Sequence, residues 1–183
     1  MTTRFIWALL LAFVVSLTAL AGLGYGVSRL RLALSPQPTI YRNIFFELDL
    51  ANGWTCRQDG TEQVCFPDQT KPHAAIAVIA MKYRNKDDNL AAYEKHLKQP
   101  QKSNDQNPPS EVRSVKRSMI GEREWVESLH VGSEIPNYLT YYAATATSHV
   151  GILVTMSVHK DRADRYIKEF GEMLKTMRTY QRG

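Results

Sequence analysis

The sequence has few of the residues that mark catalytic or metal sites. Among its 183 residues are only two cysteines, with eight residues between them, whereas structural zinc sites usually take cysteine pairs two to four residues apart. No Gly-x-Ser-x-Gly motif is present to position a serine nucleophile. The five histidines are dispersed along the chain: His73, His96, His130, His149 and His159. These absences predict a protein without a metal site, a cofactor or catalytic residues, and therefore not an enzyme.

Charged side chains are absent between Arg4 and Arg29, and this gap contains a long apolar run. Residues 5–27 supply the roughly 20 apolar residues that a transmembrane helix needs. A cleaved signal segment is the alternative, because the Ala-Leu-Ala sequence at 19–21 resembles a cleavage site. No cysteine lies near the end of the run, which argues against a lipoprotein. We therefore predict that residues 1–28 are a transmembrane anchor or a signal segment, with residues 5–27 in the membrane.

The formal net charge of +5 is spread over a chain that is rich in both signs. Nucleic-acid-binding proteins usually cluster their lysines and arginines on one element. The densest basic stretch, residues 113–123, is interrupted by Glu122 and is expected to be a solvated strand face. We therefore expect no nucleic-acid partner. Positive charges flank the apolar run on both sides, so the positive-inside rule does not choose its orientation.

The rest of the chain alternates between strand and helix patterns. Residues 29–43 predict an extended linker, because two prolines prevent a helix there. The run at 74–83 is apolar on both faces, which predicts a central strand covered on both sides. Period-two alternation predicts strands at 44–50, 54–58, 62–66, 74–83, 111–119, 122–131, 138–147 and 150–158, and apolar stripes predict helices up to Lys98 and over 162–179. We expect one α+β domain over 44–181, an antiparallel β-sheet meander with one inserted and one C-terminal amphipathic helix.

The order of these elements resembles the Mog1/PsbP-like fold. The resemblance lies in a short aromatic strand, the Asn52-Gly53-Trp54 turn, a two-sided apolar strand, a helix, four strands and a long terminal helix. It covers roughly residues 40–181, and Ala51-Asn52 stands where members often carry a proline before the Gly-Trp pair. The group includes photosystem II extrinsic subunits, a Ran-binding protein and bacterial envelope or secretion-accessory proteins. The resemblance implies a binding or assembly role and supplies no catalytic motif.

Cys56 and Cys65 flank a turn signal at Gly60-Thr61. If this pair forms a two-residue turn, the register places the cysteines opposite each other, with α-carbons about 4.5 Å apart, where a disulfide can form. The same register puts Arg57 on an apolar face, so we expect either an exposed edge or a longer loop. An Asp59-Gly60 turn would leave the cysteines diagonal, and two free structural thiols are the alternative. A disulfide behind a membrane-targeting segment places the domain outside the cytoplasm.

Tyr138, Tyr141 and Tyr142 are the candidate partner-binding residues. Tyrosine suits interfaces because it combines an apolar ring with a hydroxyl group. Tyrosine is also a good strand former, so packing within the sheet is the alternative role for these residues.

Together these features predict a non-enzymatic, membrane-anchored binding or accessory protein of the bacterial envelope, with another envelope protein as its partner. It would lie in the inner membrane with its domain in the periplasm, or free in the periplasm if the N-terminal segment is cleaved. One alternative is a small envelope hydrolase that uses dispersed His, Ser and Glu residues, with His130 or His149 beside an acid and a nucleophile. The other is an anchored adaptor that faces the cytoplasm.

Overall fold

The computed structural model describes residues 39–67, 73–102, 108–132, 135 and 138–180, and all of them belong to one compact unit. The predicted anchor or signal at 1–28 and most of the predicted linker lie outside the described residues. Within the described ranges, no helix has the length and apolar character needed to cross a membrane.

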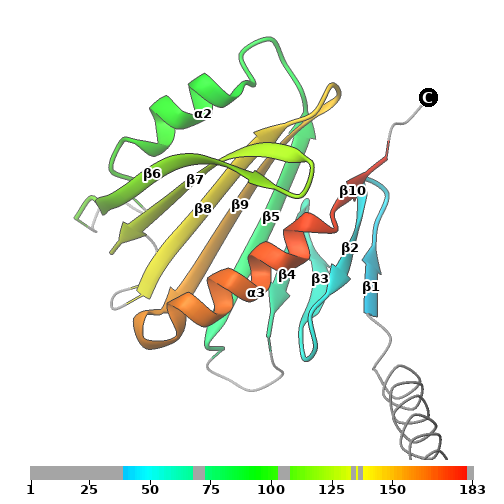
Figure 1. Ribbon diagram of the computed structural model, residues 1–183, viewed down its shortest axis with the longest axis horizontal. Helices are drawn as coiled ribbons and strands as arrows, with labels where there is room; N and C mark the ends of the chain where they lie inside the picture. Colours follow the sequence, from blue (N-terminus) through cyan, green and yellow to red (C-terminus); the bar gives the residue numbers. More distant parts are fainter. Residues whose placement is uncertain (1–38, 68–72, 103–107, 133–134, 136–137, 181–183) are drawn as a thin grey trace, which may run out of the picture. The chain divides into compact units, whose positions relative to one another are not determined.

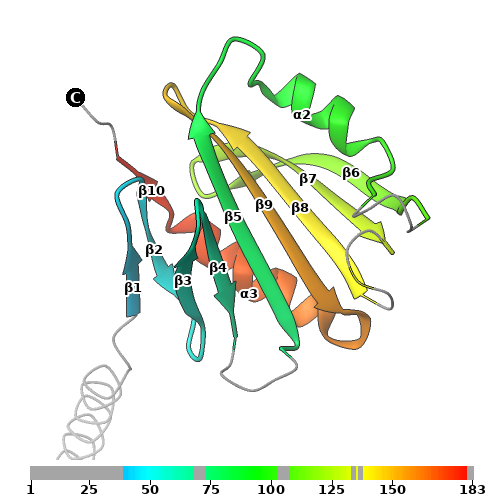
Figure 2. The ribbon, with the colours of Figure 1, turned by 180° about the vertical axis from the view of Figure 1, so that it is seen from behind.

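A seven-stranded antiparallel sheet forms the centre of the unit, with the strand order β3-β4-β5-β9-β8-β7-β6 (Figures 1 and 2). Its strands are β3 (Thr55–Asp59), β4 (Glu62–Phe66), β5 (Ala75–Tyr83), β6 (Glu111–Ile120), β7 (Arg123–Val131), β8 (Tyr138–Ala146) and β9 (Val150–His159). The antiparallel α+β prediction is confirmed, but the simple meander is wrong at one point. The connection through α2 (Leu90–Leu97) carries the chain to the far edge, so β9 rather than β6 pairs with β5.

A second sheet of three short strands has the order β1-β2-β10 and consists of β1 (Thr39–Arg42), β2 (Phe46–Leu50) and β10 (Arg178–Thr179). The linker prediction is therefore wrong for β1, which pairs with β2 from Thr39↔Leu50 to Arg42↔Glu47. The alternation predicted for β2 is confirmed, because its apolar residues are buried and its acidic residues are half-buried. The first two described strands and the last one thus form a small sheet of their own.

The C-terminal helix α3 (Ala163–Lys175) covers one face of the large sheet, here called the front face. In Figure 1 it lies in front of the strands, and in Figure 2 it lies behind them. Its buried stripe consists of Ala163, Tyr166, Phe170, Met173 and Leu174. The helix is shorter than predicted at both ends, because a 3-10 turn, η1 (Lys160–Arg162), precedes it and the residues after Met177 pair with β2 as β10.

Trp54 fixes α3 to the turn between β2 and β3. Its ring is almost fully buried, with its centroid 6.1 Å from that of Tyr166 and 5.4 Å from that of Phe170. The indole N–H donates a hydrogen bond of 3.1 Å to Glu169 Oε2. The preceding Gly53 has φ of 82°, and a side chain there would meet the Pro67 carbonyl oxygen at 3.1 Å. The Gly-Trp pair therefore needs glycine for the turn and tryptophan for the helix contact.

The helix α2 covers part of the opposite face, here called the back face. A small separate core lies beneath it and consists of Leu97, Val126, Tyr142 and Ala144. Asn89 caps the helix by accepting the Ala92 N–H at 2.9 Å. Asp88, the residue before this cap, is buried and forms an ion pair of 2.8 Å with Lys82. The two helices thus lie on opposite faces of one sheet, and α2 is the shorter of the two.

Replacing Phe170 by alanine should test how far the unit depends on the contact between α3 and the front face. Phe170 is fully buried, so Phe170→Ala should lower the free energy of unfolding by about 3–5 kcal/mol. The matched control is Tyr83→Ala, which removes an exposed ring and should change stability by no more than about 0.5 kcal/mol. Urea unfolding followed by circular dichroism measures both values, and equal losses would contradict the assignment of α3 to the core.

Candidate functional site

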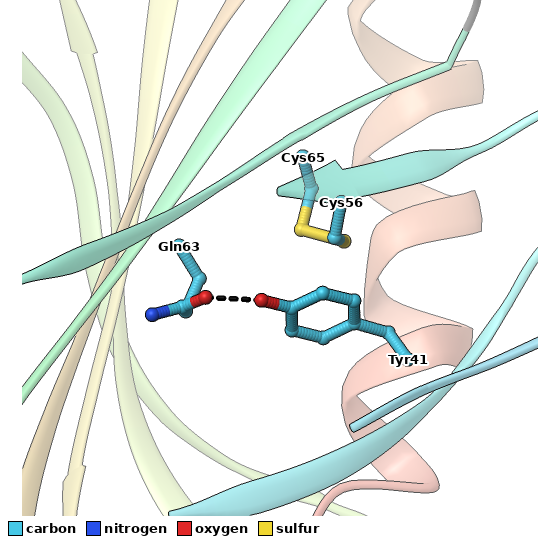
Figure 3. The surroundings of a disulfide bond; sticks show 4 residues. All are labelled: Tyr41, Cys56, Gln63 and Cys65. Atoms are coloured by element: carbon cyan, nitrogen blue, oxygen red, sulfur yellow. Dashed lines mark hydrogen bonds between the residues drawn. A yellow bond between two sulfur atoms is a disulfide. The ribbon is translucent and has the colours of Figure 1, made fainter. Parts of the chain in front are cut away.

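Cys56 and Cys65 are joined by a disulfide in the hairpin of β3 and β4, with their α-carbons 4.0 Å apart (Figure 3). They face each other in the register that the Gly60-Thr61 turn predicts, and Gly60 has the positive φ, 59°, that this turn requires. The edge on which Arg57 lies is exposed, so its charge is not buried. Its guanidinium carbon lies 5.7 Å from the centre of the Phe66 ring. The disulfide therefore joins the edge strand β3 of the large sheet to its neighbour β4.

Figure 3 also shows how the small sheet meets this hairpin. Tyr41 of β1 extends toward β4, where its hydroxyl donates a hydrogen bond to the Gln63 side chain. The same ring packs against Phe46, with the ring centres 6.0 Å apart. A residue that the sequence assigns to the linker is thus part of the packing around the disulfide.

The three predicted partner-binding tyrosines do not form a common surface. Tyr141 is buried in the front core, and its hydroxyl donates to Glu127 Oε2 at 2.9 Å. Burial, and then the neighbouring Glu127, raise the pKa of this hydroxyl. Tyr142 is buried on the back face under α2, while Tyr138 is half-buried with its ring edge against His159. The recognition surface proposed from the sequence is therefore wrong for Tyr141 and Tyr142, because β8 is a central strand covered on both faces.

Ser110 and His130 form the contact that most resembles a catalytic pair, but its geometry is structural. Both residues are buried. His130 Nε2 lies 3.1 Å from the Leu97 carbonyl oxygen, which can only accept, so this nitrogen carries the proton. Nδ1 therefore accepts from Ser110 Oγ at 2.9 Å, and that hydroxyl accepts the Gln101 N–H at 2.8 Å. Burial lowers the pKa of His130, so its neutral ring joins the end of α2 and the residue before β6 to β7.

The remaining candidates for the hydrolase alternative are not assembled either. Glu127 accepts hydrogen bonds from Tyr141 and Ser118 and lies 3.8 Å from the Lys116 ammonium. His149 lies on the turn between β8 and β9 and is exposed. In the described ranges, no group of three or more His, Cys, Asp or Glu side chains is placed to hold a metal ion. Glu127 thus serves packing and local contacts.

An apolar hollow in the back face lies beside α2, and we call it the α2 groove. Its volume is about 340 Å³. Its lining consists of Tyr93, His96 and Leu97 from α2 and Ala80, Met81, Lys82, Ala144, Gly151, Ile152 and Leu153 from the sheet. Figure 2 shows why it is open, since α2 lies toward β6, β7 and β8 and leaves β5 and β9 uncovered on this face. Leu153 remains 38 % exposed although it is a large apolar residue in a central strand.

One end of the α2 groove is lined by polar side chains that hydrogen bonds and an ion pair hold in place. Asp88 accepts hydrogen bonds from the Tyr93 hydroxyl at 3.1 Å and the Asn85 N–H at 2.8 Å, and it pairs with Lys82. Burial, and then the hydrogen bond to Asp88, raise the pKa of Tyr93 to about 12. A side chain at Gly151 would meet the Tyr93 hydroxyl at 2.6 Å, so glycine is needed for this ring to lie on the sheet. The groove therefore has an apolar floor, a polar end and a wall held by hydrogen bonds.

The second apolar face of β5, with Ile76, Val78 and Ala80, predicts a layer that covers this side of the strand. In the structure these three residues are only half-buried. The prediction of a strand covered on both faces is thus wrong for this part of β5, because α2 is too short to extend over it. The uncovered apolar face forms part of the floor of the groove.

No protein-family model matches the chain, and no curated protein shows significant sequence similarity to it. Solved structures do match. A protein of Bacteroides thetaiotaomicron superposes with a TM-score of 0.59 at 18 % identity over 80 % of this chain, which corresponds to only half (50 %) of that protein. The cyanobacterial PsbP of Synechocystis, CyanoP, gives a TM-score of 0.55 at 13 % identity, covering 78 % of this chain and 92 % of CyanoP. The fold is Mog1/PsbP-like.

Another solved structure that matches is LpqN of Mycobacterium tuberculosis, described as involved in cell envelope biogenesis. It gives a TM-score of 0.52 at 7 % identity, covering 81 % of this chain and 88 % of LpqN. At these identities the likeness concerns the fold, and the resemblance seen in the order of elements is thereby confirmed.

The buried position of His130 predicts a pH dependence of stability. Its pKa in the folded unit lies below the ordinary value of 6.5, so the unfolded chain takes up the proton more readily. The stabilisation is therefore fully present above pH 6.5 and is lost as the pH falls below that value toward the pKa of the folded state. Urea unfolding at pH 7 and pH 5 should show a larger loss for the natural protein than for His130→Gln. The matched control His149→Gln, at an exposed position on the turn between β8 and β9, should keep the full loss of stability. An equally large loss in His130→Gln would contradict the assignment.

Proposed function

We propose that this protein is a non-enzymatic binding or accessory protein of the cell envelope that acts through contacts with another protein. Residues 5–27 hold it at the inner membrane, and its folded unit faces the periplasm. The α2 groove takes one large apolar side chain of the partner. The observation that carries the proposal is this open apolar groove in the back face of an otherwise well-packed sheet.

The shape and lining of the α2 groove support the role of a binding pocket. Its volume of about 340 Å³ lies within the usual range for ligand sites, which are mostly apolar with a few fixed polar groups. In protein interfaces, a few anchor side chains in such pockets carry most of the binding energy. The wall formed by Tyr93 and Asp88 is already held by hydrogen bonds, so little ordering is needed when a partner binds.

The envelope location is supported by two observations. The disulfide between Cys56 and Cys65 is of a kind that persists in oxidising compartments and is rare in the cytoplasm. LpqN, which shares the fold, is described as involved in cell envelope biogenesis. The apolar run at 5–27 adds a means of attachment to the membrane.

Photo-crosslinking in intact cells tests the α2 groove as the docking site. A photoreactive amino acid at Leu153 should give one adduct of defined mass with a protein of the envelope. A second substitution in the groove, Ala80→Glu, should reduce this adduct at least about tenfold, because a carboxylate in the pocket would have to be desolvated when the partner binds. The matched control carries the photoreactive group at Met119, which is 63 % exposed on β6, and should not give this adduct. An adduct of equal yield from Met119, or one insensitive to Ala80→Glu, would refute the site.

Mass analysis of the intact chain without reduction tests the compartment. The chain purified from cells, with thiols blocked during lysis, should weigh two hydrogen atoms less than the same chain with both cysteines reduced, and it should carry no blocking group. Its mass also decides between an uncleaved anchor and a signal segment removed near residue 21. Two blocked thiols would favour the adaptor that faces the cytoplasm and would remove the support for the periplasm.

A further inference from the structure

A second surface, distinct from the α2 groove, gathers exposed apolar side chains at one end of the unit. We call it the Tyr83 patch, and it consists of Ile44, Phe45, Tyr83, Arg84, Ser148, His149, Val150 and Tyr180. Tyr83 is 69 % exposed, Ile44 is 59 % exposed and Tyr180 is 38 % exposed, and these three are among the most exposed large apolar residues of the described chain. In Figures 1 and 2 the turn from β1 to β2, the end of β5, the turn from β8 to β9 and the residue after β10 lie together.

Hydrogen bonds hold the segments of the Tyr83 patch in place. The Tyr180 N–H donates to the Phe45 carbonyl at 2.8 Å, and the Arg84 N–H donates to the His149 carbonyl at 2.8 Å. The Arg84 side chain adds donated bonds to the Asp88 carbonyl at 3.1 Å and the Thr147 carbonyl at 2.9 Å. The apolar side chains are therefore presented by an ordered frame, and their exposure does not arise from fraying of the strand ends.

The charges around the Tyr83 patch are mainly positive. Glu47 pairs with both Arg42, at 2.8 Å, and Arg178, at 3.0 Å, and it also accepts a hydrogen bond from the Tyr180 hydroxyl. Arg84 forms no ion pair with a carboxylate of the described residues, since the nearby Asp88 carboxylate pairs with Lys82. Glu47 is thus matched by two arginines, and Arg84 adds a further positive charge within the patch itself.

We propose that the Tyr83 patch docks on the surface of a bilayer that contains anionic phospholipid. The tyrosine rings and Ile44 enter the interfacial layer, and the arginines approach the lipid phosphates. Tyrosine is enriched at membrane interfaces, and apolar side chains beside basic ones are typical of surfaces that bind anionic bilayers. This inference rests on the proposed function, because the attachment through residues 5–27 supplies the nearby membrane.

The chain between the apolar run and the folded unit is long enough for this contact. Eleven residues, 28–38, separate the end of the run from Thr39. Fully extended, they span up to about 36–40 Å. The patch begins at Ile44, just beyond the end of the four-residue strand β1, and such a strand is only about 13 Å long. A molecule anchored through residues 5–27 can therefore place the Tyr83 patch on the same membrane.

Quenching of a tryptophan at position 83 by brominated lipid tests the proposal. The full chain with Trp7→Phe and Tyr83→Trp is reconstituted in vesicles in which one lipid in three is phosphatidylglycerol. The introduced tryptophan should be quenched, whereas Trp54 and Trp125 are buried and should keep their emission. In vesicles of phosphatidylcholine alone the quenching should fall, because each arginine near an anionic surface favours the docked state roughly fivefold. The control is Met119→Trp in the same background, an exposed position on β6 that should stay unquenched.

Two further measurements separate this inference from the proposed function. Adding Ile44→Glu should abolish the quenching, whereas Met119→Glu should leave it unchanged, and circular dichroism should show both variants folded. Extraction with carbonate tests the anchor independently, and a chain that is extracted refutes the attachment on which the inference rests. A chain that stays in the vesicles with an unquenched Tyr83→Trp refutes membrane docking alone, and it would leave a protein partner as the occupant of the patch.

Discussion

The rest of the unit depends on the packing of α3 against the front face. Trp54 holds the helix in this position. Tyr166 and Phe170 contact the indole ring, and Glu169 accepts its N–H. Because α3 ends at Lys175, the chain that follows can pair with β2 as β10. This pairing brings Tyr180 beside Phe45. The helix therefore completes the front core and also builds one side of the Tyr83 patch.

The two helices cover unequal parts of the two faces of the large sheet. The stripe of α3 continues along the front face, whereas the eight residues of α2 cover only part of the back face. A fully covered sheet would offer a partner little more than loops and edges. The uncovered part exposes apolar groups of β5 and β9 next to the fixed pair of Tyr93 and Asp88. An incomplete back layer is thus the physical origin of the proposed docking site.

The polar groups that suggest a hydrolase have structural explanations in the described unit. Both nitrogens of His130 are used, one by Ser110 and one by the carbonyl at the end of α2. Glu127 is occupied by two hydroxyl groups and a nearby lysine. A catalytic pair requires a proton acceptor that a substrate can approach, and these groups instead connect neighbouring elements.

Local pattern in the sequence determined much of this protein. The period of two in β2 and β9, the apolar stripe of α3 and the pairing of Cys56 with Cys65 follow from spacing along one or two adjacent elements, so they could be predicted. The pairing of β5 with β9, the burial of Tyr141 and Tyr142, the α2 groove and the Tyr83 patch were decided by the tertiary structure. Each of these features depends on which distant segments of the chain become neighbours. An amphipathic pattern shows that one face of an element is covered, but it does not show which element covers that face or how much of it is covered. The length of α2 and the return of the chain end to β2 supply that missing information.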